Sequence, residues 1–231
     1  MKRSDQKVVL ISGAGRGLGA ALAAHFAEGD WRVVGQYHRS RPRLAAPHFA
    51  VKADLSREAG ARKVVTETVR RFGRIDVLIN NSGVYHPKGI DRLTEGEWME
   101  GLQTTVSATF FLTRAALPHL RKTRGRVVNI GDSSCERLGK RDLSLSYHVG
   151  KTGVLLATRA FAHAEARRRV TVNMVSPGML ENSVGKPPAS RMPMGRFGQF
   201  ADVIGAVDYL LSPGAEYVTG SNLIVGGGWN L

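Results

Sequence analysis

A tyrosine and a lysine four residues apart are the side chains of this sequence best suited to proton-transfer chemistry. Tyr147 and Lys151 lie near the start of a segment with helical spacing, so their side chains should share one face of a helix. A phenol has an ordinary pKa of about 10, and a neighbouring ammonium group lowers it by favouring the phenolate. The pair therefore suits a proton transfer coupled to hydride transfer, although the same pair also occurs on ordinary protein surfaces.

A glycine-rich turn near the start of the chain indicates a second kind of chemistry, the binding of phosphate. Gly13, Gly17 and Gly19 follow the apolar run 8–11 and open a helical pattern over 18–26. Glycines permit a tight turn and a close approach of the backbone to a pyrophosphate, which the amino end of the helix attracts. Between a strand and a helix, this turn predicts a dinucleotide site rather than an ordinary connection.

The residues after the second predicted strand indicate which dinucleotide binds. An acid about 20 residues beyond the glycines would bind the ribose hydroxyls of NAD, whereas a 2′-phosphate calls for basic groups. The strand 32–37 is followed by His38, Arg39 and Ser40, with no acid among them. Arg39 and Ser40, joined by Arg16 of the glycine turn, can bind the phosphate through charge-assisted and hydroxyl hydrogen bonds. The sequence therefore predicts NADP(H), the alternative being an ordinary solvated basic turn.

Short apolar runs alternate with helical patterns along the chain. The predicted strands cover 8–11, 32–37, 49–53, 77–79, 127–130, 170–175 and 223–225. The predicted helices cover 18–26, 58–72, a long segment ending near 118–121, and 146–165. Near-continuous apolar strands separated by helices are typical of a parallel sheet buried on both faces. We therefore expect one α/β domain over residues 1–231, a Rossmann-like, doubly wound parallel sheet with helices on both faces.

The stretch from Leu180 to Phe200 interrupts this alternation. It contains Pro187, Pro188 and Pro193 and follows the sixth predicted strand. Ligands of open α/β sheets bind at the carboxyl ends of the strands, so we expect a substrate lid at about 180–200. Its residues match no chemical motif, and the sequence therefore does not identify the substrate.

Further short motifs follow the predicted strands in a regular order. Asp54 follows the third strand, Asn80-Asn81-Ser82-Gly83 the fourth and Ser176-Pro177-Gly178 the sixth. With the glycine turn and the Tyr147–Lys151 pair, they resemble the short-chain dehydrogenase/reductase family over essentially the whole chain. The resemblance implies that Tyr147 donates the proton, while Lys151 lowers its pKa and binds the nicotinamide ribose. The predicted cofactor site comprises Gly13, Arg16, Gly17, Leu18, Gly19, His38, Arg39, Ser40, Asp54, Leu55, Asn81, Ser82, Gly83, Tyr147, Lys151, Pro177 and Gly178.

Two positions depart from the usual pattern of that family. The helix asparagine that takes part in its proton relay is replaced by Thr105. The usual serine after the fifth strand is replaced by Asp132, when the strand 128–131 anchors the comparison. An aspartate there resembles the pteridine reductase and dihydromonapterin reductase branch, in which Asp, Tyr and Lys act together. The turn 36–40 also resembles the NADPH-binding turn of pteridine reductases.

The loop before Tyr147 leaves alternatives for the third catalytic residue. Asp132 lies two residues farther from Tyr147 than the family pattern expects, whereas Ser134 has the usual separation. Loops accept insertions more readily than strands do, which favours the anchoring on the strand. The predicted catalytic set is therefore Tyr147, Lys151 and Asp132, with Ser133 or Ser134 as the alternative to Asp132.

Composition and charge limit the class of protein. The hydrophobic fraction of 42% and the charged fraction of 23% are ordinary for a soluble globular protein. Lys and Arg number 33 against 19 Asp and Glu, and the formal charge of +14 can mark a nucleic-acid binder. The basic residues lie in clusters without interleaved aromatic residues or a known nucleic-acid module: 39–43, 121–126, 137–141 and 167–169. We therefore expect a solvated basic surface, partly facing the cofactor, and no nucleic-acid partner.

The remaining features concern compartment, metals and assembly. No apolar stretch reaches the roughly 18 residues that cross a bilayer, and the segment after Met1–Lys7 is too short for a signal peptide. Cys135 is the only cysteine and is assigned no role, and the histidines show no metal-ligand pattern. These observations fit a soluble cytoplasmic protein that binds neither a metal nor a membrane. The glycine-rich tail 225–231, which carries Trp229, favours packing against a neighbour in a homotetramer or homodimer.

These features together favour an NADPH-dependent enzyme with a small-molecule substrate. The leading hypothesis is reduction of a carbon–nitrogen double bond in a dihydropterin-like substrate. The first alternative is carbonyl reduction of a 3-oxoacyl thioester or a similar ketone, which the same fold supports. The second is a regulator that senses the dinucleotide without catalysis, although such a protein has no chemical need for Tyr147 and Lys151.

Overall fold

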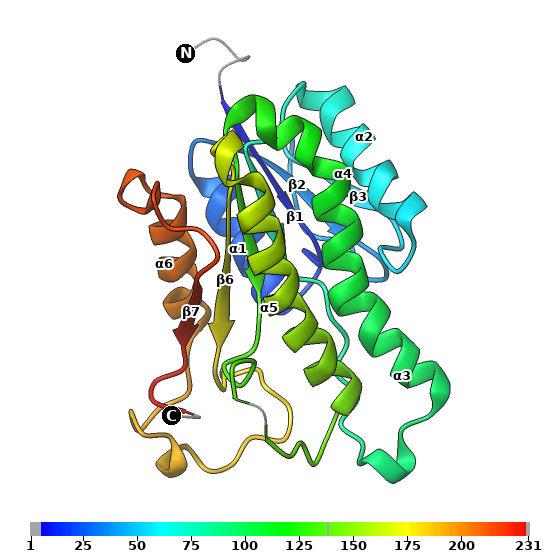
Figure 1. Cartoon of the computed structure of the whole chain (residues 1–231), viewed down its shortest axis with the longest axis vertical. Helices are drawn as coiled ribbons and strands as arrows, with labels where there is room; N and C mark the ends of the chain where they lie inside the picture. Colours follow the sequence, from blue (N-terminus) through cyan, green and yellow to red (C-terminus); the bar gives the residue numbers. More distant parts are fainter. Residues whose placement is uncertain (1–5, 138, 230–231) are drawn as a thin grey trace.

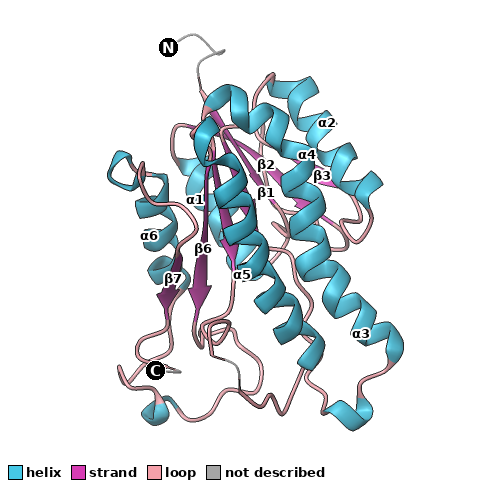
Figure 2. Ribbon diagram, viewed as in Figure 1, coloured by secondary structure: helices cyan, strands magenta, loops and turns pink. Residues whose placement is uncertain are grey.

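Seven parallel strands form a single sheet in the computed structural model, which describes residues 6–137 and 139–229 (Figures 1 and 2). Their order is β3-β2-β1-β4-β5-β6-β7, so the chain builds outward from β1 and then, after a reversal, outward from β4. Such a reversal opens a crevice at the carboxyl ends of the two central strands. The predicted doubly wound α/β fold is therefore confirmed.

The seven strands and the helices predicted over 18–26, 58–72 and 146–165 lie where the apolar patterns placed them, with small shifts at their ends. The strands are β1 Lys7–Ile11, β2 Trp31–Tyr37, β3 Phe49–Lys52, β4 Val77–Asn80, β5 Arg126–Ile130, β6 Thr171–Pro177 and β7 Asn222–Val225. The helices are α1 Gly17–Glu28, α2 Glu58–Phe72, α3 Glu95–Leu102, α4 Ala108–Thr123, α5 Leu145–Glu165 and α6 Phe200–Leu211.

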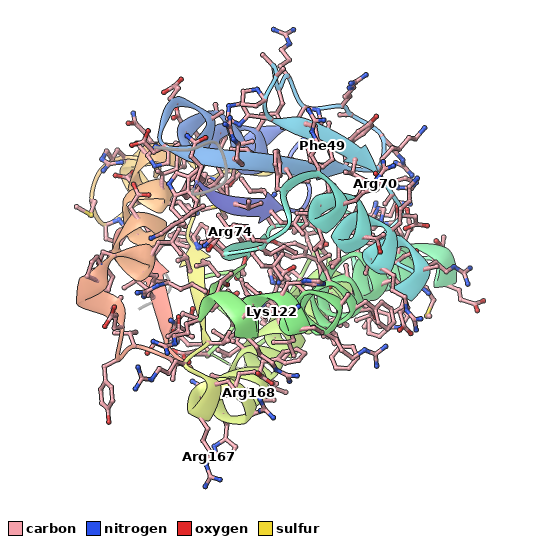
Figure 3. All side chains as sticks on the ribbon, turned by 90° about the horizontal axis from the view of Figure 1, so that it is seen from above. Phe49, Arg70, Arg74, Lys122, Arg167 and Arg168 are labelled. Atoms are coloured by element: carbon pink, nitrogen blue, oxygen red, sulfur yellow. The ribbon has the colours of Figure 1, made fainter. Side chains whose placement is uncertain are left out.

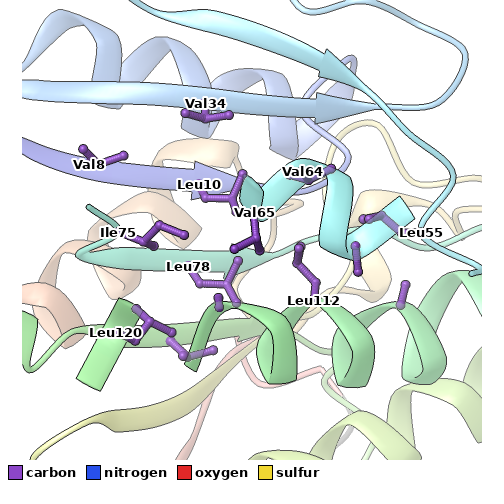
Figure 4. Packing of buried hydrophobic residues seen from close by; sticks show 14 of the residues in the cluster. Val8, Leu10, Val34, Leu55, Val64, Val65, Ile75, Leu78, Leu112 and Leu120 are labelled. Carbon is purple, nitrogen blue, oxygen red and sulfur yellow. The ribbon is translucent and has the colours of Figure 1, made fainter. Parts of the chain in front are cut away.

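Helices cover both faces of the sheet, with α2, α4 and α5 on one face and α1 and α6 on the other (Figure 1). On the first face, Leu10 and Leu78 of the sheet pack in one buried cluster with Val64 of α2 and Leu112 of α4 (Figure 4). Each such side chain stabilises the fold by roughly 1.5–3 kcal/mol when fully buried. Because both faces of the central strands are covered, these strands are apolar almost throughout. They can therefore be recognised in the sequence as continuous apolar runs.

The long helix predicted to end near 118–121 is in fact two helices joined by one π-helical turn. This turn covers Gln103–Ser107, between α3 and α4. Pro118 lies inside α4 without ending it, and the helix continues to Thr123. A proline removes one backbone hydrogen bond, but the buried Leu117 and Leu120 hold α4 against the sheet on either side of it.

The C-terminal third contains a helix that the sequence analysis did not predict. In α6, Val203, Val207 and Leu210 are buried at helical spacing against the sheet. Before it, the segment 180–200 is an irregular excursion held by a bridge between Leu180 and Gly198.

The glycine-rich tail packs against this excursion of its own chain. A Cβ atom at Gly228 would lie 2.9 Å from Pro193, and one at Gly227 would lie 3.4 Å from Met194. Asn230 and Leu231 of the predicted tail contact lie outside the described residues, as do Met1–Asp5. The packing of this tail against a neighbouring subunit stays a prediction.

Candidate active site

The glycine turn after β1 forms a cradle of bare backbone at the amino end of α1. Gly13 and Gly17 have φ angles of +63° and +54°, which side-chain-bearing residues rarely adopt. A Cβ atom at Gly19 would overlap the carbonyl oxygen of Gly13, so this position also requires glycine. Leu18 is buried beneath the turn, whereas Arg16 at the N-cap is exposed. Such a cradle fits a pyrophosphate group.

Buried polar side chains hold the cradle in place. The Gln36 side chain accepts a hydrogen bond from the Gly13 backbone at 2.9 Å and donates one to the Ala53 carbonyl at 2.7 Å. From the other side, the Asn81 amide donates to the Gly13 carbonyl at 3.2 Å, and the Ser82 backbone donates to the Ser12 hydroxyl at 3.1 Å. The turn is therefore tied to both neighbouring strands, and the predicted loop after β4 lies directly beside it.

The basic turn after β2 lies next to the glycine cradle. His38, Arg39 and Ser40 are all exposed, and a Cβ atom at Gly15 would overlap the Ser40 backbone. The structure thus brings Ser40 beside the turn that carries Arg16, as expected for a shared phosphate site. The Arg39 guanidinium faces Glu100 of α3, with 3.6 Å between Nη2 and Oε1.

The loop after β3 and the loop after β6 complete the predicted surroundings of the cofactor. Leu55 is buried, and the exposed Asp54 accepts a hydrogen bond from the Ser56 backbone at 2.9 Å. Pro177 ends β6, and the Gly178 backbone donates to the Val225 carbonyl at 2.9 Å. Both loops leave the sheet at its carboxyl edge, as the glycine turn does.

Asn182 is a residue of this site that the sequence analysis missed. A Cβ atom at Gly17 would lie 3.2 Å from the Asn182 amide nitrogen, so this side chain reaches the pyrophosphate cradle from the 180–200 excursion. The excursion carries no chemical motif, and no pattern in the sequence pointed to Asn182. A side-chain amide there offers a hydrogen-bond donor to a phosphate oxygen.

Helix α5 presents Tyr147 and Lys151 on one face, as their spacing predicted. The Lys151 ammonium is buried, lies 5.5 Å from the centre of the Tyr147 ring, and donates to the Ile130 carbonyl at 2.6 Å. Gly83 lies beside both, since a Cβ atom there would be 3.6 Å from the Tyr147 ring and 3.7 Å from Lys151. The pair therefore shares the carboxyl edge of the sheet with the cofactor cradle.

The pKa values of this pair differ from the sequence-based expectation. Burial, followed by the charge of Asp132, raises the pKa of the Tyr147 phenol above its ordinary value of 10, and no lowering by Lys151 is found. Burial lowers the pKa of Lys151 to about 8, because an ammonium group loses its hydration there. In the protein alone, Tyr147 is therefore held protonated at neutral pH rather than activated as a phenolate.

The two alternatives for the third catalytic residue are hydrogen-bonded to each other. Asp132 Oδ1 accepts from the Ser134 backbone at 2.9 Å and also from the Ser134 hydroxyl. The imidazole Nδ1 of His148 lies 4.0 Å from the same oxygen. Ser133 is buried, with its backbone donating to the Pro177 carbonyl. The Asp132 charge raises the pKa values of Tyr147 and Lys151, which places this carboxylate within their electrostatic reach.

Thr105, which replaces the family's helix asparagine, lies in the π-helical turn beside this site. Its hydroxyl donates to the Gly101 carbonyl at 2.6 Å, and the residue is fully buried. A Cβ atom at Gly150 would overlap that hydroxyl oxygen, so the glycine lets α5 approach the turn. Because the Gly101 carbonyl accepts its proton, the Thr105 hydroxyl has only its acceptor capacity left for other groups at this site.

Tyr85 is a second residue that the sequence analysis missed. Its ring meets the Tyr147 ring edge to face, with 5.3 Å between the centroids. Cys135 is buried, and burial raises the pKa of its thiol to about 12, so it stays protonated. Within residues 6–137 and 139–229, no group of three or more His, Cys, Asp and Glu side chains is placed to hold a metal ion.

Comparison with known proteins identifies the family. A family model described as enoyl-(acyl carrier protein) reductase matches residues 13–230. L-fucose dehydrogenase of Bos taurus is 35% identical, over 97% of this chain and 90% of that protein. The chain belongs to the short-chain dehydrogenase/reductase family. It is thus related to NAD(P)-dependent oxidoreductases, and the glycine cradle fits such a cofactor.

Other members of the short-chain dehydrogenase/reductase family show the same similarity. The 3-oxoacyl-(acyl-carrier-protein) reductase FabG of Vibrio cholerae is 31% identical, over 97% of each chain. The crystal structure of a 3-ketoacyl-(acyl-carrier-protein) reductase from Brucella melitensis, complexed with NADH, superposes with a TM-score of 0.90 at 28% identity. It covers 99% of this chain and 100% of that one. None of these relatives is a pteridine reductase, so the predicted branch is not confirmed.

In the described part of this chain, no helix is long and apolar enough to span a membrane.

Proposed function

We propose that this enzyme reduces a ketone to an alcohol with NADPH and catalyses the reverse oxidation. The observation that carries the proposal is the Tyr147–Lys151 pair, which lies at the same sheet edge as the glycine cradle and beside Gly83. The oxoacyl reductases among the relatives favour a 3-oxoacyl thioester as the first substrate class to test. The carbonyl alternative thus replaces dihydropterin reduction as the leading hypothesis.

The chain's own residues supply the proton and the positioning. When bound, the nicotinamide supplies a hydride to the carbonyl carbon. Tyr147 donates its phenolic proton to the carbonyl oxygen, and its raised pKa keeps this proton in place at neutral pH. Lys151 would hold the nicotinamide ribose, because its ammonium group donates one proton to the Ile130 carbonyl and has two more to donate.

NADPH is favoured over NADH by the charges at the end of β2. Arg39 and Ser40 are exposed beside the turn that carries Arg16, and the segment 36–41 contains no acid. A carboxylate there would repel a 2′-phosphate, whereas a guanidinium group binds it through charge-assisted hydrogen bonds.

Dihydropterin reduction remains the second candidate because of Asp132. A carboxylate within electrostatic reach of Tyr147 suits a substrate that presents N–H donors, such as the amino-pyrimidine edge of a pterin. An aliphatic ketone offers no such donor. The hydrogen bonds from Ser134 reach Asp132 Oδ1, and no residue among 6–137 and 139–229 donates a hydrogen bond to Oδ2, so this oxygen can accept one from a substrate.

A substrate panel with purified protein tests the proposal. Acetoacetyl thioester and 7,8-dihydropterins are each offered with NADPH and with NADH, and oxidation of L-fucose is measured in the reverse direction. Tyr147→Phe is the control that retains the fold but lacks the proton. We expect thioester turnover with NADPH that this control lacks. Dihydropterin turnover alone would establish the second candidate instead, and wild-type turnover equal to that of the control for every substrate would contradict both.

A further inference from the structure

Three basic clusters that lie far apart in the sequence come together at one end of the molecule. They are the segments 70–74 and 121–124, at the ends of α2 and α4, and 167–169, in the turn that follows α5. In a doubly wound parallel sheet each connecting helix runs antiparallel to the strands, so the helices end at the amino edge of the sheet. Figure 3 looks onto this edge, and the labelled Arg70, Arg74, Lys122, Arg168 and Arg167 follow one another across it. We call these three segments the basic end.

Three carboxylates pair with cations of the basic end and balance only part of its charge. Asp76 is largely buried and pairs with Arg74 at 2.6 Å, while the buried Glu165 pairs with Arg121 at 2.6 Å. Five further cations are exposed and form no ion pair with a carboxylate of the described residues, namely Arg71, Lys122, Arg124, Arg167 and Arg169. The partly exposed Glu67 of α2 pairs with Arg70, and with five unpaired cations the outer layer of this end carries an excess of positive charge.

Two of these arginines occupy backbone positions at which glycine is preferred. Arg124 and Arg169 end α4 and the 3₁₀ turn after α5 with φ angles of 50° and 58°, in the left-handed region. The corresponding position at the end of α2 is Gly73, with a φ angle of 75°. A non-glycine residue there costs roughly 1–2 kcal/mol. One or two cations suffice to offset the partial charge at a helix C-terminus, so helix stability alone does not explain this number of arginines.

We propose that the basic end binds the phosphate backbone of a nucleic-acid duplex without reading its bases. Four of the five unpaired cations are arginines, whose planar guanidinium groups bind phosphate oxygens in pairs. A row of such groups suits a polymer with regularly spaced phosphates. This proposal replaces the expectation of a merely solvated basic surface, because only the fold brings the clusters together.

The chemistry of the basic end favours a duplex over single strands or a membrane. None of the exposed large apolar side chains in the described residues belongs to the segments 70–74, 121–124 or 167–169. Single strands are normally held by stacking on aromatic rings, and peripheral membrane proteins commonly insert apolar side chains. Duplex backbone binding needs neither of these and depends on charge alone.

The measurement is binding of a fluorescent 20-base-pair DNA duplex to the full-length protein over a range of salt concentrations. Five phosphate contacts predict a slope of about −4.5 in log K against log salt, which is about a 500-fold loss of affinity between 50 and 200 mM. At 150 mM salt we expect a Kd within about 10⁻⁶–10⁻⁴ M. No binding at that salt concentration would overturn the proposal.

Matched charge variants locate the binding surface. The variant Arg71→Gln/Lys122→Gln/Arg167→Gln removes three cations of the basic end, and Lys63→Gln/Arg92→Gln/Arg191→Gln removes three exposed cations elsewhere. We expect the first to bind at least tenfold more weakly, with a slope shallower by about 2.7, and the second to bind within twofold of wild type. Equal losses in the two variants would show attraction by overall charge and would refute a dedicated surface.

A third variant separates binding from a structural role. Arg124→Gly/Arg169→Gly places glycine at the two left-handed positions, so its Tm should be no lower than that of wild type, while its duplex affinity should fall several-fold. Unchanged affinity would contradict the assignment of these arginines.

Vesicles containing phosphatidylserine are the remaining probe, and binding to them but not to the duplex would replace the proposal with a membrane surface. Reductase turnover should be unchanged in the two variants of the basic end, because these residues lie at the amino edge of the sheet and Tyr147 lies at its carboxyl edge.

Discussion

The charge on Lys151 should set the upper pH limit of the reduction. Burial lowers its pKa to about 8 from the ordinary 10.5, so the ammonium loses its proton at a lower pH than an exposed lysine does. A pKa of about 8 leaves roughly 0.9 of the molecules charged at pH 7 and roughly 0.1 at pH 9. Tyr147 has a raised pKa and stays protonated throughout this range. The value of kcat/KM for NADPH, which reports the free enzyme, should therefore be level below pH 8 and fall about tenfold per pH unit above it.

Two variants test whether this fall belongs to Lys151. Arginine keeps its charge over the whole range, so Lys151→Arg should lose the fall near pH 8 even if its activity is lower. The Asp132 charge raises the pKa of Lys151, so Asp132→Asn should move the midpoint to a lower pH than that of wild type. A wild-type profile that stays level to pH 9.5, or an unchanged midpoint in Lys151→Arg, would refute the reasoning.

Three other expectations concern the cofactor, the third catalytic residue and assembly. Arg39→Ala should weaken NADPH binding by about 1.5–3 kcal/mol and leave NADH binding nearly unchanged in a fluorescence titration; equal wild-type affinity for the two cofactors would contradict this. Asp132→Ser should reduce any dihydropterin turnover strongly while ketone turnover is kept or improved. If Ser134→Ala abolishes turnover while Asp132→Ala does not, the serine is the third catalytic residue. Light scattering should show a tetramer or a dimer, and a monomer at micromolar concentration would exclude both.

The central part of the fold was predictable because its physical pattern is local. Strands such as Val77–Asn80 are covered on both faces, so they appear as short apolar runs, and their regular alternation with helical patterns identifies them as strands. The break between α3 and α4 was not predictable, because Gln103–Ser107 continues the helical spacing and only a change in backbone hydrogen bonding marks the π-helical turn. Helix α6 was not predicted, although Val203, Val207 and Leu210 have helical spacing. The proline-rich stretch 180–200 indicated an irregular segment, and no helix was expected directly after it.

The candidate site was partly predictable, and the missed parts depend on contacts between distant segments. The glycines of the turn after β1 and the Tyr147–Lys151 pair of α5 could be predicted, because each set is recognised from the spacing of residues within one short segment. Asn182 and Tyr85 approach the site from irregular loops, where no periodicity constrains the direction of a side chain. The raised pKa of Tyr147 likewise comes from burial and from Asp132, neither of which the spacing of the pair reveals.

The central claim, that Tyr147 is the proton donor of a ketone reductase, is tested most directly by Tyr147→Phe. The phenylalanine ring retains the packing against Tyr85 but lacks the hydroxyl group. Loss of a general acid typically costs about 10²–10⁴ in rate. With the best ketone of the panel, kcat should therefore fall at least about 100-fold, while the Kd for NADPH stays within about twofold of wild type. A variant that retains near-wild-type kcat would contradict the claim.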